Sequence, residues 1–341
     1  EPPPAPCQYA NVLPPAFREV VTQQEAHDAY NLPDARILGP PATDPHQPTT
    51  GVSKVTTLRG MRVVVKRIGE PRRRAPLELR HAYNIFFKTE ARNHLQAYVN
   101  LPPACREFLS IPACMEMDAS KLVGSYPYTV QTFLEMPGHR LLTAWDFFAY
   151  HTDPNDPTLR RLDNSVIQSI CEGFGRMIGC MYRSKIRHAD LHQDNVLLLV
   201  PDAFAEFVLD YRVNKTLDFG ALHGHTDVKW RMIDWGESEA LNPVVPLQLC
   251  KATDPKQVSN GQTTDTELQL WGVLGASGKS CQIVRETCMS LIRKAMASPP
   301  DGRHPPSKLR APKPTEKQLV DWVNAAIVTE LAALGRELTR A

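Results

Sequence analysis

His188-Ala189-Asp190-Leu191-His192-Gln193-Asp194-Asn195 is the most informative stretch of this sequence of 341 residues. It follows a segment with helical character, 164–183, and the apolar run 196–200 comes directly after it. Its histidine, first aspartate and asparagine have the spacing H-x-D-x-x-x-x-N. Asp190 is placed to receive or orient a hydroxyl group. Asn195 can offer its side-chain oxygen to magnesium, a hard cation that prefers oxygen ligands, and His188 is expected to be structural.

A second metal ligand is expected from a D-x-G triplet after the next strand, and the sequence offers two such triplets. The residues before Asp218-Phe219-Gly220 are unlike those of a strand. Asp234-Trp235-Gly236, in contrast, follows the predicted strand 228–233. In that run Val, Trp and Met alternate as in a half-buried strand. We therefore favour Asp234 as the metal ligand, with Asp218 as the rival. Residues 201–227 then form an insertion between two strands.

Two β-branched runs nearer the N-terminus predict a hairpin, 52–58 and 61–68, separated by Arg59-Gly60. The segment 77–98 lacks proline and glycine and predicts a long helix. Two further strands are expected at 109–115 and 128–136. The predicted order is therefore strand, strand, helix, strand, strand.

A lysine and a glutamate in these elements are expected to pair. Lys66 ends the apolar part of the second run, where a buried charge without a partner would be costly. Glu90 lies midway along the predicted helix and is our choice of partner. Glu78, on the same helix, is an alternative that the sequence leaves open.

These motifs, in this order, resemble the protein-kinase-like superfamily over residues 51–274. More narrowly, D-L-H-x-D-N with I-D-W is similar to the loops of aminoglycoside and choline phosphotransferases and of divergent protein kinases such as haspin. The resemblance implies an α+β, two-lobed protein-kinase-like fold, with a small N-terminal β-sheet lobe that carries one helix and a larger, mostly helical C-terminal lobe. We expect a proline-rich N-terminal arm at 1–36, the N-terminal lobe at 37–136 and the C-terminal lobe at 137–341.

The resemblance also implies two cofactors, ATP and magnesium, and roles for the residues that match its motifs. The residues expected to act in catalysis are Asp190, Lys66, Glu90 and His192, and the expected metal ligands are Asn195 and Asp234. His192 stands where ordinary serine/threonine kinases have lysine. It can contact the γ-phosphate or Asp190, or it can simply be hydrogen-bonded to backbone.

The nucleotide is expected to lie against a connector between the lobes, within 132–138. Leu134 would be the gatekeeper, and backbone groups at Glu135 and Met136 would bond adenine. The sequence departs from the family at the phosphate loop, where Gly51 is one glycine in place of three. It also lacks a clear A-P-E triplet after the D-x-G.

The expected function is therefore an ATP- and magnesium-dependent phosphotransferase, a divergent serine/threonine protein kinase acting on a hydroxyl group of a protein substrate. The alternatives are a small-molecule kinase of the aminoglycoside or choline type, and a nucleotide-binding pseudokinase that acts as an interaction module. The region after 274 contains no conspicuous acidic cluster of the kind that lines small-molecule acceptor sites.

Composition adds expectations about partners and compartment. A formal net charge of +2 gives no electrostatic case for nucleic acid, and no apolar run is long enough to span a bilayer. The eight cysteines include no C-x-x-C pair, so we expect reduced, structural cysteines. We expect an intracellular protein, cytoplasmic or nuclear, although the sequence begins without Met and a segment can have been removed.

Overall fold

The structure is a computed structural model with a mixed α+β architecture and antiparallel sheets. The residues that it describes are 6–38, 52–68, 77–118, 127–143, 164–184, 186–188, 195–209, 227–236, 238–240 and 316–340. The chain divides into two compact units. The first consists of Glu1–Leu134 with Asp234–Ala240, and the second of Glu135–Ile233 with Leu241–Ala341.

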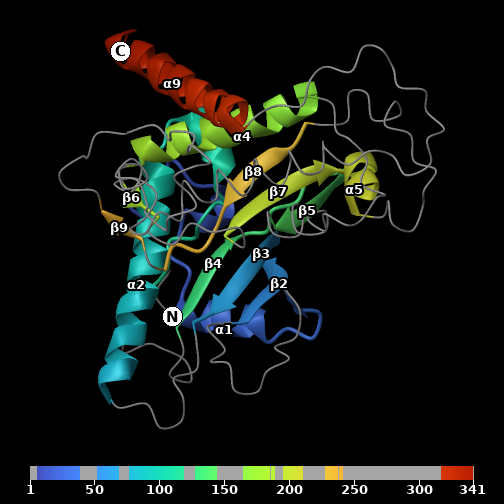
Figure 1. Cartoon of the computed structure of the whole chain (residues 1–341). Coiled ribbons are helices and arrows are strands. Elements are labelled where there is room, and N and C mark those ends of the chain that lie inside the picture. Colours follow the sequence, from blue (N-terminus) through green and yellow to red (C-terminus); the bar gives the residue numbers. More distant parts are fainter. Residues whose placement is uncertain are drawn as a thin grey trace. The chain divides into compact units, whose positions relative to one another are not determined.

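The first unit is built on a four-stranded antiparallel sheet, shown in blue and green in Figure 1. Its strands, in spatial order, are β1 (Arg36–Ile37), β2 (Val52–Leu58), β3 (Met61–Arg67) and β4 (Tyr128–Thr132). The predicted hairpin is confirmed as β2 and β3, whose turn residues Arg59 and Gly60 both have positive φ, 49° and 75°. Glycine adopts this conformation without steric cost. The valines of β3 at 63–65 are buried in the core.

The predicted helix is confirmed as α2 (Leu77–Asn100), which is followed by the short helix η2 (Pro103–Phe108). α2 ends just before Leu101-Pro102 because a residue that precedes proline avoids the helical conformation. The strand predicted at 109–115 does not form a continuous strand in the structure. This segment makes only isolated bridges, an antiparallel one between Pro112 and Gln131 of β4 and a parallel one between Met115 and Val21.

The N-terminal segment differs from the extended arm that its prolines predict. Its described part belongs to the first unit and contains η1 (Pro15–Phe17) and α1 (Gln23–Tyr30). Proline is compatible with the first turn of a helix, where its missing N–H is not needed, and Thr22 with Glu25 forms a capping box at the start of α1. Gln23 is fully buried, and its side chain bonds both the N–H and the C=O of Tyr128.

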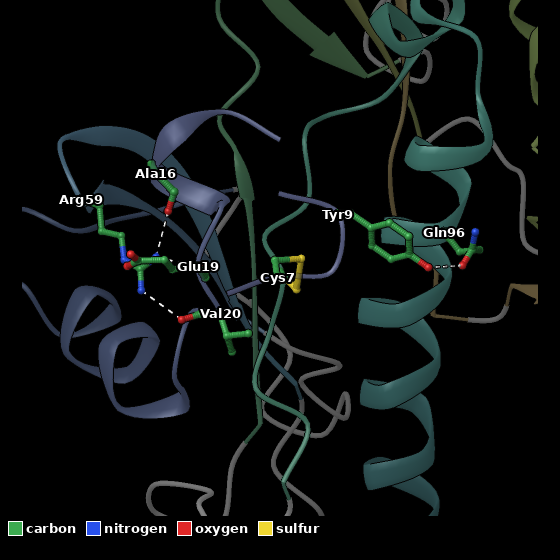
Figure 2. The surroundings of a disulfide bond; sticks show 8 residues. Cys7, Tyr9, Ala16, Glu19, Val20, Arg59 and Gln96 are labelled. Carbon is green, nitrogen blue, oxygen red and sulfur yellow. Dashed lines mark hydrogen bonds between the residues drawn. A yellow bond between two sulfur atoms is a disulfide. The ribbon is translucent and has the colours of Figure 1, made fainter. Parts of the chain in front are cut away.

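A disulfide joins this segment to the rest of the first unit. Cys7 and Cys114 are bonded across a sequence separation of 107 residues (Figure 2), so the expectation of reduced cysteines is wrong at these two positions. The spacing of cysteines could not predict the bond because each partner is brought there by long-range packing. Nearby, the Arg59 guanidinium donates to three carbonyl oxygens of the N-terminal segment, those of Ala16, Glu19 and Val20.

The second unit contains a three-stranded antiparallel sheet with the order β5 (His139–Thr143), β7 (Val196–Pro201), β8 (Lys229–Met232). β7 and β8 confirm the two predicted strands, whereas β5 was not predicted. Every residue of β7 is buried, as its continuous apolar sequence requires. The short helix α5 (Asp202–Leu209) occupies the start of the predicted insertion, and the remainder of that insertion lies outside the described residues.

Two long helices of the second unit pack together, α4 (Asn164–Arg183) and α9 (Glu316–Arg340) (Figure 1). The helix predicted for 164–183 is confirmed by α4. Gly175 lets the two backbones approach, since a Cβ at this position would overlap the carbonyl oxygen of Val323 and lie 2.9 Å from the Cβ of Ala326. An ion pair between Arg176 and Glu330, 3.3 Å long, flanks this contact.

The sequence also predicts helices at 267–274 and 281–296, and both segments lie outside the described residues. Among the helices that are described, none has the length and apolar character needed to cross a membrane.

Candidate functional site

The first unit brings together one lysine and two carboxylates from three separate parts of the chain. The Nζ of Lys66, on β3, lies 3.1 Å from both carboxylate oxygens of Glu90 on α2. The same Nζ lies 2.7 Å from Oδ1 of Asp234, which follows β8 in sequence. Lys66 therefore donates to both carboxylates, and we call these three residues the Lys66 cluster.

Burial and charge act together on the Lys66 cluster. Burial on its own would lower the pKa of Lys66, but the facing carboxylates of Glu90 and Asp234 outweigh it and raise that pKa above the ordinary lysine value. Burial also raises the pKa of Glu90, the neighbouring Asp234 raises it further, and Lys66 opposes both effects. Two carboxylates thus share one ammonium group that keeps its proton.

Asp234 has an unusual backbone conformation for a residue with a side chain. Its φ is 64°, in the left-handed region, where residues other than glycine are uncommon and are often found at functional sites. Its side chain is 41% exposed, compared with 11% for that of Glu90. Asp234 is therefore the member of the Lys66 cluster that solvent ions reach most easily.

The segment after Asp234 is held by α2. Trp235 is fully buried, and its ring stacks on the ring of His94 with 5.6 Å between centroids. Asn93 donates from its side chain to the carbonyl oxygen of Ser238 at 2.8 Å. We did not identify these residues from the sequence. The usable signal was helical spacing, since Asn93 and His94 lie three and four residues after Glu90 and share its face of the helix.

The structure bears on both open alternatives in this unit. Of the two D-x-G triplets, Asp234 lies against Lys66, and Asp218 lies outside the described residues. Of the two candidate glutamates, Glu90 contacts Lys66, and the side chain of Glu78 lies outside the described part of α2. The strand before Asp234 is more deeply buried than the half-buried alternation predicted, because Trp230, Arg231 and Met232 are all buried.

The two ends of the H-x-D loop, His188 and Asn195, lie in the second unit. His188 is buried, and its Nε2 donates to the carbonyl oxygen of Ile233 at 2.8 Å. The N–H of Ile233 donates to the carbonyl oxygen of Asn195 at 3.0 Å. Both ends of the loop are thus anchored to the residue before Asp234 in the sequence. The residues between them, with Asp190 and His192, lie outside the described residues.

The remaining predicted site residues are those of the nucleotide-binding connector and the phosphate loop. Leu134 belongs to the first unit and is half-buried, and Glu135 and Met136 belong to the second unit, the former exposed and the latter half-buried. Gly51, predicted for the phosphate loop, lies outside the described residues.

Comparisons with known proteins give little further guidance. No protein-family model matches the chain, and no curated protein matches it. Among solved structures, the chain is similar to the crystal structure of the BubR1 kinase domain, with a TM-score of 0.37 and 13% sequence identity. The match covers 89% of this chain and 82% of that one. At this degree of similarity, the function has to be argued from the residues of this chain.

Proposed function

We propose that the chain is an ATP- and magnesium-dependent phosphotransferase, specifically a divergent serine/threonine protein kinase that transfers the γ-phosphate to a protein hydroxyl group. The observation that carries the proposal is the Lys66 ammonium group held between Glu90 and Asp234. Phosphoryl transfer depends on positioning and on neutralising phosphate oxygens, and a fixed lysine beside a metal-binding carboxylate supplies both.

The charge of the Lys66 cluster favours a divalent cation. Two carboxylates and one ammonium group leave one negative charge in excess at a partly buried position. A cation bound by Asp234 would neutralise that excess and free Lys66 to bind a phosphate oxygen. Asp234 and Asn195 both offer oxygen atoms, which suits magnesium better than zinc.

The backbone at Asp234 supports the same assignment. A left-handed conformation costs a non-glycine residue of order 1–3 kcal/mol, and it persists here at a charged side chain that packing of Trp235 and Ser238 keeps in place. The strain is consistent with a side chain held in a required orientation.

The other roles follow from the sequence motif. Asp190 would orient the acceptor hydroxyl and receive its proton, and His192 would contact the γ-phosphate. Backbone groups of Glu135 and Met136 would bond adenine beside Leu134, and Gly51 would lie at the phosphates.

The proposal is tested by measuring transfer of radiolabelled phosphate from magnesium-ATP to generic protein substrates, to amino alcohols and to aminoglycosides. We expect labelled protein, and we expect Asp190→Asn to reduce turnover roughly 10²–10⁴-fold while the affinity for magnesium-ATP stays unchanged. Labelling of a small molecule alone would favour the small-molecule kinase. Magnesium-ATP binding without any transfer would favour the pseudokinase, and no binding at all would refute the proposal.

A matched pair of variants tests the metal ligand. Asp234→Ala should weaken magnesium-ATP binding, measured by calorimetry, because it removes a carboxylate from the Lys66 cluster, and Asp218→Ala should leave it unchanged. The reverse result would move the metal site to the first D-x-G triplet.

A further inference from the structure

The disulfide of the first unit ties together two segments that both hold the same turn of α2. Tyr9, two residues after the first cysteine, donates its hydroxyl to Oε1 of Gln96 at 3.1 Å, as Figure 2 shows. The carbonyl oxygen of Ser110, four residues before the second cysteine, accepts from Nε2 of His94 at 3.0 Å. The two contacts lie two residues apart on α2, so one covalent bond links the two anchors of this turn.

This turn of α2 is adjacent to the Lys66 cluster. Glu90 precedes His94 by four residues and therefore lies on the same face of the helix, one turn away. His94 also stacks on Trp235, the residue after Asp234. A displacement of this turn would consequently reach both carboxylates that bind Lys66.

We propose that the Cys7–Cys114 disulfide is a redox-sensitive positioning device, whose reduction by a dithiol loosens the turn of α2 around His94 and Gln96 and weakens the pairing of Lys66 with Glu90. Cys7 is 4% exposed and Cys114 is partly exposed. A reductant is therefore expected to approach the bond from Cys114, the more exposed of the two cysteines.

The reaction is a thiol–disulfide exchange that consumes one dithiol for each bond. A thiolate of the dithiol attacks the Sγ of Cys114, the more exposed of the two cysteines, and forms a mixed disulfide, while Cys7 leaves as a thiolate and takes up a proton. The second thiol of the reagent then displaces Cys114. The dithiol ends as a disulfide and the protein ends with two thiols, so two electrons and two protons are transferred.

Without the disulfide, the chain around Cys7 would be held by non-covalent contacts alone. The N–H of Cys7 donates to the carbonyl oxygen of Arg18 at 2.8 Å, and that of Val21 donates to the carbonyl oxygen of Cys114 at 2.8 Å. A segment held in this way opens more often than one held covalently. Each opening removes the contact between Tyr9 and Gln96.

Hydrogen exchange of the full-length protein tests the device directly. The oxidised protein is first digested without reductant to detect the cross-linked Cys7–Cys114 peptide by mass spectrometry, and a second sample is treated with dithiothreitol. We expect amide hydrogens of 91–100 to exchange roughly tenfold faster after reduction, the change expected for losing about one hydrogen bond's stabilisation. Equal exchange in the two samples would overturn the proposal, as would absence of the cross-linked peptide.

Cysteine variants show whether this bond is responsible. The double variant Cys7→Ser/Cys114→Ser should exchange fast at 91–100 with and without dithiothreitol, and Cys171→Ser, which changes a buried cysteine outside this disulfide, should respond like the wild type. A dithiothreitol response that survives in the double variant would overturn the proposal. If the double variant does not fold, Tyr9→Phe tests the proposal instead. Its oxidised form should already exchange faster than the wild type at 94–96. Exchange at the wild-type rate in that form would count against the device.

The consequence for ligand binding rests on the proposed function. We expect magnesium-ATP to bind the reduced protein roughly three- to tenfold more weakly, since a less populated competent state lowers affinity in proportion. If neither form binds magnesium-ATP while exchange still responds, the proposed function fails and the device stands. If both forms bind equally, the link from the disulfide to Glu90 is refuted and the proposed function stands.

Discussion

Replacing Lys66 with methionine should destabilise the protein by an amount that grows with pH. The ammonium group of Lys66 lies within 3.1 Å of Glu90 and 2.7 Å of Asp234. Methionine is similar in length and has no charge, so the variant leaves the buried carboxylate of Glu90 without its cation. Breaking a buried ion pair by removing one partner costs about 3–5 kcal/mol.

Protonation of Glu90 sets an upper limit to this cost. A carboxyl group with an ordinary pKa of 4.5 takes up a proton at pH 7 for about 3.4 kcal/mol, at about 1.36 kcal/mol for each pH unit. At pH 5 the same step costs about 0.7 kcal/mol. We therefore expect the loss in free energy of unfolding to fall from about 3 kcal/mol at pH 7 to below about 1 kcal/mol at pH 5.

The sign of this dependence follows from proton binding. Burial raises the pKa of Glu90 in the folded state, so the folded variant binds more protons than the unfolded chain once the pH exceeds the ordinary value. Stability is then lost as the pH rises through the folded pKa. The wild-type lysine, whose pKa is raised from 10.5, keeps its proton, so its own contribution is lost only at pH values above that ordinary value.

Urea unfolding between pH 5 and pH 8, followed by circular dichroism, measures the effect. Lys54→Met is the matched control on the neighbouring strand, because the ammonium group of Lys54 donates to the carbonyl oxygen of Tyr30 and lies over its ring. Its cost should not depend on pH. Lys66→Met combined with Glu90→Gln should lose the pH dependence as well. A penalty for Lys66→Met that is equal at pH 5 and pH 7 would refute the reasoning.

Two glycines give further predictions. A Cβ at Gly236 would lie 3.6 Å from Oδ1 of Asp234 and 3.8 Å from Oε2 of Glu90. Gly236→Ala should therefore leave the free energy of unfolding within about 0.5 kcal/mol of the wild type and still weaken magnesium-ATP binding in calorimetry; unchanged affinity would argue against a ligand at these carboxylates. Gly175→Ala should destabilise the second unit by about 1–3 kcal/mol in urea, because the methyl group overlaps Val323 on α9, and a stabilised variant would contradict the close packing of α4 on α9.

Local sequence patterns were sufficient for the elements whose stability is mainly local. The hairpin follows from β-branched runs on either side of Arg59-Gly60, and α2 and α4 follow from long stretches without a helix breaker. The pairing of Lys66 with Glu90 was also accessible, because a lysine on a buried strand requires a counter-charge.

Long-range contacts explain what the sequence did not reveal. The N-terminal segment folds because Gln23 finds its partners at Tyr128 and because a disulfide reaches 107 residues along the chain. Neither contact can be inferred from the residues that are neighbours in the sequence. β5 was missed for the same reason, since its short sequence becomes a strand only by pairing with β7.

The first unit is completed by a piece of chain that is synthesised late. Residues 234–240 belong with 1–134, and a ribosome needs about 5–20 s to add the roughly 100 residues between them, at about 5–20 residues per second. During that interval Lys66 and Glu90 can already meet, whereas Asp234 and the aromatic partner of His94 have not yet been made. The Lys66 cluster can therefore be completed only after residues 135–233 have been synthesised.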